Sequence, residues 1–85
     1  MTMGHERSDG ATGLQYDRAS HRWMLRGRPL HCGDGLDVRV GGHWLPCRVE
    51  FDGRLGWILL TDFDTVRILP SARLSVRPDR ADGRW

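Results

Sequence analysis

The sequence predicts an all-β domain, a small and partly open antiparallel barrel of the SH3-like or Tudor-like kind with five to six short strands. Apolar and polar residues alternate with a period of two along residues 33–60, as they do in strands that bury one face. Glycine-bearing turns separate these segments, and no part of the chain shows helical periodicity over three turns.

The central stretch predicts three consecutive antiparallel strands at residues 36–40, 43–51 and 56–60. Gly41 and Gly42 join the first two strands, because a two-residue hairpin turn needs positive φ angles. We expect the core to contain Val38, Val49 and Leu59. Alternation along the second strand assigns four side chains to its buried face: Leu45, Cys47, Val49 and Phe51.

Shorter strands are expected on both sides of this stretch. Residues 14–16 and 22–26 predict a first hairpin. Residues 66–69 predict a short strand or a turn of 3₁₀ helix, and residues 73–77 predict a closing strand.

Length and composition limit the class of protein. A chain of 85 residues holds one domain, which we place at residues 14–78, between a poorly ordered tail at 1–13 and a polar tail at 79–85. No apolar run approaches the roughly 20 residues that cross a bilayer. The N-terminus lacks the apolar centre of a secretory signal, and two cysteines are too few for a disulfide scaffold. We expect a cytoplasmic protein that does not bind membranes.

All thirteen basic residues are arginine, and eleven carboxylates leave a formal net charge of +2. A GC-rich genome explains this preference without any function, whereas guanidinium groups also suit the recognition of phosphates and carboxylates. The charges are spread along the chain, without the basic block that nucleic-acid binders usually carry.

Several short motifs follow one another along the chain: Arg-Trp-Met-Leu-Arg-Gly at residues 22–27, Leu-His-Cys-Gly-Asp at 30–34, Trp44, Arg-Val-Glu at 48–50 and Gly-Trp-Ile-Leu at 56–59. In this order they resemble a bacterial domain family of unknown function that recurs on phages and integrative conjugative elements. The similarity covers residues 16–77, and the run at 30–34 is its most specific part. The resemblance implies a small standalone domain from a mobile element that acts on a host machine, and it implies no catalytic residues.

Four residues have side chains that commonly bind zinc: His31, Cys32, His43 and Cys47. Their spacing does not favour a site. His43 and Cys47 are about 13 Å apart at the usual rise of a strand, whereas zinc needs each ligand within about 2.3 Å. We therefore expect no metal and no other cofactor.

The pair His31-Cys32 also suggests a nucleophile beside its base. Adjacent side chains of an extended chain point to opposite sides, so His31 is badly placed to deprotonate Cys32. A domain of this size also has little concave volume for a substrate. We therefore expect neither an enzyme nor a small-molecule substrate. We interpret residues 32–35 as a tight turn in which the Asp34 carboxylate accepts backbone N–H groups.

Three tryptophans lie in the predicted strands. Trp23 and Trp57 are within apolar segments, and we expect both to fill the core. Trp44 shares the polar side of its strand with Pro46 and Arg48. Two interpretations of Trp44 are open: a half-exposed aromatic anchor for a partner, or a side chain that covers a barrel end or packs on Pro46.

These observations predict a non-enzymatic binding module. Mixed charge around an aromatic side chain favours a protein partner, recognised through Trp44, Arg48, Glu50 and Arg39. The alternative is nucleic-acid binding, with Trp44 as the stacking side chain and five arginines as phosphate contacts: Arg22, Arg26, Arg28, Arg39 and Arg48. An inhibitor of a host defence nucleoprotein would combine the two. The salt dependence of binding separates them, because phosphate contacts weaken steeply with salt.

The expectation that the protein binds no metal has a direct test. A structural zinc ion contributes folding free energy, so its removal lowers stability. We expect a chelator to leave the thermal midpoint of unfolding unchanged, as measured by differential scanning fluorimetry. Stoichiometric zinc in the purified protein would contradict the spacing argument.

Overall fold

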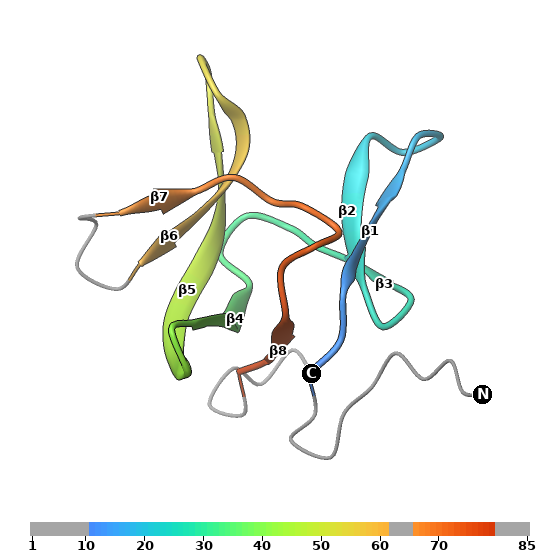
Figure 1. The fold of residues 1–85 in the computed structure, drawn as a ribbon. Helices are drawn as coiled ribbons and strands as arrows, with labels where there is room; N and C mark the ends of the chain where they lie inside the picture. The colour runs from blue at the N-terminus through green and yellow to red at the C-terminus, as the bar shows by residue number, and fades with distance from the viewer. Residues whose placement is uncertain (1–10, 62–65, 80–85) are drawn as a thin grey trace.

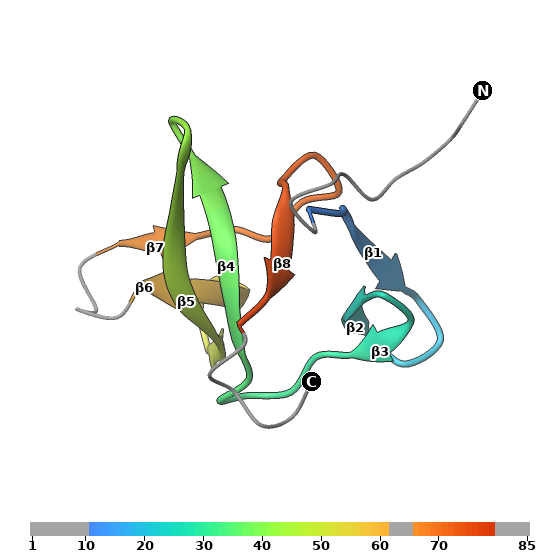
Figure 2. The ribbon, with the colours of Figure 1, turned by 90° about the horizontal axis from the view of Figure 1, so that it is seen from below.

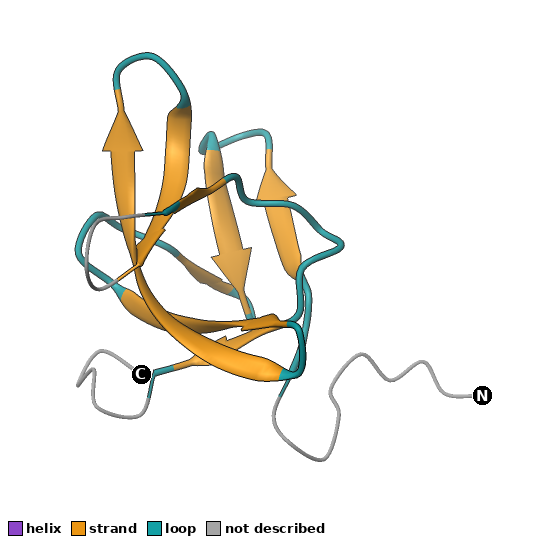
Figure 3. Ribbon diagram, turned by 60° about the vertical axis from the view of Figure 1, so that its left-hand side comes forward, coloured by secondary structure: helices purple, strands orange, loops and turns teal. Residues whose placement is uncertain are grey.

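The protein folds into strands only, which confirms the all-β prediction. The computed structural model describes residues 11–61 and 66–79. Within these ranges there are eight strands in two antiparallel sheets (Figure 1). Figure 3 shows the described chain as strands and loops, without a helix. None of the described residues therefore forms a helix capable of spanning a membrane.

The larger sheet has five strands in the order β7-β6-β5-β4-β8. Its strands are β4 (Gly35–Val40), β5 (His43–Asp52), β6 (Gly56–Thr61), β7 (Arg67–Ile68) and β8 (Val76–Pro78). The smaller sheet has the order β1-β2-β3. Its strands are β1 (Leu14–Asp17), β2 (Arg22–Leu25) and β3 (Arg28–Pro29). A partly open barrel was expected, but among the described residues β7 and β8 do not pair with each other, so the larger sheet does not close into a barrel.

The central meander forms as predicted, with each boundary within one residue of its expected place. Gly41 and Gly42 join β4 to β5 with φ angles of 57° and 83°, which give the left-handed turn that the pair suggests. Val38 pairs with Leu45, and Val49 pairs with Leu59. Val38, Val49 and Leu59 are all buried in the core, as expected.

The shorter strands are only partly as expected. The predicted first hairpin is β1–β2, and β7 is a short strand within residues 66–69. The predicted closing strand begins later, at Val76, because Leu74 N donates to Ser71 O at 3.2 Å and closes a turn before it. Strand β3 was not predicted, because a strand of only two residues is too short to show alternation.

A bridge between Thr12 and Val76 joins the two sheets. Thr12 N donates to Val76 O at 2.8 Å, and Val76 N donates to Thr12 O at 2.9 Å. Figure 2 shows β8 between β4 and β1 as a result. Because Ala11 is also buried, residues 11–13 belong to the fold and not to the predicted tail. The remainder of that tail, residues 1–10, and residues 80–85 of the C-terminal tail lie outside the described residues.

One apolar cluster fills the space between the sheets. It takes buried side chains from both: Leu14, Leu25, Leu30, Leu36, Val38, Cys47, Val49, Leu59 and Val76. Trp23 and Trp57 pack against this cluster and are only partly buried, so the expectation that they fill the core is wrong. Trp57 lies at the edge of the core cluster, where its indole Nε1 donates to the His21 carbonyl oxygen at 2.9 Å.

Phe51 is also placed differently from the prediction. It lies on the core side of β5 by alternation, yet 58% of its surface is exposed. The reason is the length of β5: its hydrogen bonds to the segment before β4 reach Val49, whereas Phe51 pairs with Trp57 of β6. The ring of Phe51 packs edge-on against Trp57, with centroids 5.1 Å apart.

Asp52 closes the turn between β5 and β6. Its Oδ1 accepts hydrogen bonds from Arg54 N at 2.7 Å and from Leu55 N at 3.0 Å. These bonds, the one from Arg54 first, lower the pKa of the Asp52 carboxyl. The carboxylate therefore holds this turn at neutral pH and releases it only as the pH falls through the lowered pKa.

The Gly41-Gly42 turn gives a test of the fold. We expect Gly42→Ala to lower the free energy of unfolding by about 1 kcal/mol, because an L side chain is strained at this φ. Steric contact does not contribute, since an added Cβ meets no atom within 4 Å. The control is Gly53→Ala, whose φ lies outside the left-handed region and whose Cβ is equally unobstructed. Equal losses in urea unfolding of the two variants would contradict the assignment of strain to Gly42.

Candidate functional site

One face of the larger sheet points away from the core. Leu36 and Val38 of β4 point inward, so Asp37 and Arg39 point outward. Residues paired across a ladder share a face, and Arg39 pairs with Trp44. The set, called the outer face below, comprises Asp37, Arg39, Trp44, Pro46, Arg48, Glu50 and Arg77.

Trp44 is the largest side chain of the outer face, and two arginines lie over its ring. The guanidinium carbon of Arg77 is 4.2 Å from the ring centroid, and that of Arg39 is 5.4 Å away. Each cation–π contact contributes about 0.5–1 kcal/mol at an exposed site. Trp44 is thus half-buried by its arginine neighbours, outside the apolar core cluster.

Two ion pairs hold charged side chains of the outer face. Arg77 Nε lies 3.0 Å from Asp37 Oδ2, and Arg48 Nε lies 2.9 Å from Glu50 Oε2. Arg48, Glu50 and Arg77 are each a little over one-third exposed, so these pairs add little stability. Their effect is to fix the side chains and to balance most of the positive charge on the outer face.

The accessible part of the outer face lies over β8, β4 and β5. On β6 the residues of the same face are Ile58 and Leu60, which pair with Glu50 and Arg48. Ile58 is only 3% exposed although it is not part of the core cluster. The β6 side is therefore covered, and Trp44 lies within the part that remains accessible.

The residues predicted for protein binding lie together on this face. Alternation along β4 and β5 was enough to place Arg39, Trp44, Arg48 and Glu50 on one side of the sheet. Asp37 lies between Leu36 and Val38, so alternation places it on the same side of the sheet. It was nevertheless not among the residues predicted for protein binding. Arg77 could not be found from the sequence, because its position depends on the pairing of β8 with β4.

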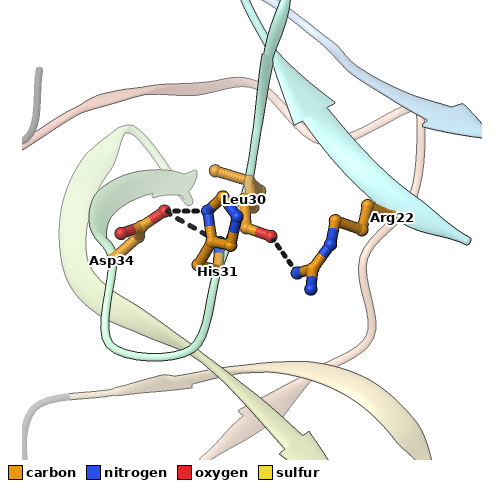
Figure 4. Close-up of polar contacts among 4 residues, drawn as sticks. All are labelled: Arg22, Leu30, His31 and Asp34. Atoms are coloured by element: carbon orange, nitrogen blue, oxygen red, sulfur yellow. Dashed lines mark hydrogen bonds and ion pairs between the residues drawn. The ribbon is translucent and has the colours of Figure 1, made fainter. Parts of the chain in front are cut away.

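The residues predicted for nucleic-acid binding do not form one surface. Arg39, Trp44 and Arg48 are on the outer face. Three others, Arg22, Arg26 and Arg28, belong to the smaller sheet, which packs against the opposite, inner side of the larger one. Arg22 has a structural role there, since its Nη1 donates to the Leu30 carbonyl oxygen at 2.9 Å (Figure 4).

The segment before β4 is the tight turn that the sequence predicts. His31 N donates to Asp34 Oδ2 at 2.8 Å (Figure 4). In return, Asp34 N donates to His31 O at 3.0 Å. Gly33 has a φ of 91° and donates its N–H to Val49 O at 2.7 Å, so the turn also continues the ladder beside β5. Asp34 is 6% exposed, and its carboxylate is used for this turn.

The histidines and cysteines are dispersed. Cys32 and His43 are exposed, whereas Cys47 is buried and its Sγ donates to Leu45 O at 3.6 Å. Within residues 11–61 and 66–79, no group of three or more His, Cys, Asp or Glu side chains could hold a metal ion.

A family model described as a domain of unknown function, DUF5348, matches residues 12–77. The chain belongs to this family. The DUF5348 match begins at Thr12, which bridges the sheets, and ends at Arg77, which lies over Trp44. It therefore spans both the joined sheets and the outer face. No curated protein and no solved structure matches this chain.

Two substitutions test whether Asp34 has a structural role in this turn. We expect Asp34→Ala to lower the free energy of unfolding by about 2 kcal/mol, because it leaves a partly buried N–H without its charged acceptor. Cys32→Ser, an exposed change in the same turn, should leave stability unchanged. Chemical denaturation of both variants measures the difference. A stable Asp34→Ala protein would show that the carboxylate does not hold the turn.

Proposed function

We propose that this DUF5348 domain is a non-enzymatic binding module that recognises a protein partner through its outer face. The observation that carries the proposal is Trp44, held under two guanidinium groups on the side of the sheet that faces away from the core. Tryptophan and arginine are the residue types most enriched where interfaces concentrate their binding energy.

The outer face is arranged before a partner arrives. Arg77 contacts both Asp37 and Trp44, so its side chain already has a fixed position. Arg48 is held in the same way by Glu50. Ordering a long side chain on binding costs about 0.5–1.5 kcal/mol, so fixing these side chains in advance favours affinity.

The balance of charge on this face favours protein over nucleic acid. Its carboxylates, Asp37 and Glu50, lie within 3.0 Å of arginine nitrogens, where they would repel phosphates. A mixed pattern of charge around an aromatic centre is typical of protein interfaces. We further propose that the partner is part of a host machine, such as a defence complex, and that the domain acts on it in the cytoplasm as the product of a mobile element.

The variant Trp44→Ala tests this function. The fold should lose about 1–2 kcal/mol of stability, the sum of two cation–π contacts, and less than the roughly 3–5 kcal/mol of an emptied core site. Affinity for a partner captured from the native host and purified should fall by about 2 kcal/mol or more, because an aromatic anchor is lost. Calorimetric titration and thermal unfolding of the same protein measure both quantities.

Leu69→Ala is the control, since it removes a large, exposed apolar side chain that lies outside the outer face. It should leave partner affinity unchanged. Undiminished affinity of Trp44→Ala, or equal losses in the two variants, would remove the outer face from the function.

A further inference from the structure

The fold concentrates positive charge that is spread out along the chain. The smaller sheet and its turns, residues 11–31, contain one carboxylate, Asp17, and four arginines: Arg18, Arg22, Arg26 and Arg28. The remaining described residues contain six arginines against five carboxylates. Three of the four net positive charges of the described residues therefore belong to the smaller sheet and its turns.

The four arginines are distributed along β2. Arg18 lies in the turn before this strand, and Arg22 is its first residue. Arg26 lies in the turn after it, and Arg28 follows on β3. Four residues of strand span about 13 Å, so these arginines, called the basic track below, are spread over a length of about two nucleotides or more. Arg18, Arg26 and Arg28 are exposed, whereas Arg22 is half-buried.

Two exposed aromatic rings lie beside one end of this track. Tyr16 is 43% exposed and packs edge-on against Trp23, with centroids 5.1 Å apart. Its hydroxyl is 3.5 Å from His21 Nδ1, and the His21 carbonyl accepts the hydrogen bond from Trp57. Phe51, the second exposed ring, packs against Trp57.

These contacts make one surface from two hairpins. The tips of β1–β2 and β5–β6 point in the same direction (Figure 1). Arg22 lies where they meet, with its guanidinium carbon 5.3 Å from the Trp57 ring centroid. An aromatic surface thus extends from Phe51 past Trp57 and Arg22 to Tyr16, and Arg26 and Arg28 lie at the other end of β2.

We propose that this surface binds single-stranded nucleic acid. Arg18, Arg26 and Arg28 supply the phosphate contacts, and Tyr16 and Phe51 stack with bases. An arginine track beside exposed aromatic rings is the usual arrangement of proteins that bind single strands. Paired bases cannot reach such rings, so duplex is bound more weakly. The proposal is independent of the protein-binding outer face, because the two surfaces share no residue.

The test is fluorescence anisotropy of a labelled 12-nucleotide oligothymidine and of a 12-base-pair duplex, over a range of salt concentrations. We expect the single strand to bind and the affinity to fall with salt. The double variant Arg26→Gln/Arg28→Gln should reduce the slope of log affinity against log salt by about 1.4, the value for two lost single-strand phosphate contacts. The control Arg67→Gln/Arg73→Gln removes the same charge from exposed positions elsewhere and should keep the slope.

Stacking is tested separately by Tyr16→Ala, which should weaken single-strand binding about tenfold or more, while Tyr16→Phe keeps it. Thermal unfolding of every variant shows that the protein remains folded. The proposal is overturned by absence of binding at 50 mM salt, by equal effects of the two arginine double variants, or by duplex affinity as high as that of the single strand. Protein-partner affinity that survives Arg26→Gln/Arg28→Gln shows that the two surfaces act separately.

Discussion

The pairing of β5 with both of its neighbours determines where the candidate site lies. Gly35 to Val40 of β4 pair with β5 on one edge, and β6 pairs with it on the other. Alternate side chains of β5 therefore enter the core or join the outer face, and a slip of one residue would exchange them. Two turns fix this register, one through the positive φ angles of Gly41 and Gly42 and the other through the Asp52 carboxylate.

The rest of the architecture follows from an open sheet whose inner face lies against the core and whose outer face stays accessible over β8, β4 and β5. The smaller sheet covers the inner side and supplies Leu14, Leu25 and Leu30 to the core. Its attachment depends on the bridge between Thr12 and Val76, which places β1 beside β8. The outer side keeps Trp44 and its arginines. The two proposed surfaces, one for protein and one for single-stranded nucleic acid, lie on opposite sides of the larger sheet, and together they would suit a nucleoprotein partner.

Local patterns in the sequence predicted the meander, its turns and the side of the sheet on which each of its residues lies. Period-two alternation was sufficient for Trp44 and Arg48, and the paired glycines were sufficient for the first hairpin turn. Long-range pairing could not be predicted in this way. The positions of Arg77 over Trp44 and of Thr12 beside Val76 depend on which strands become neighbours, and no local pattern records that choice. The exposure of Phe51 could not be predicted either. Alternation gives the side of the sheet on which Phe51 lies, but not the residue at which the pairing of β4 with β5 ends.

Site-specific photo-crosslinking in cells of the native host tests whether the outer face binds a protein partner. A benzophenone amino acid at Pro46 lies in the middle of the outer face, and the same group at exposed Leu69 lies outside both proposed surfaces. We expect a discrete, nuclease-resistant protein adduct from position 46 and none from position 69. Adducts from position 69 alone, or from neither position, would contradict it.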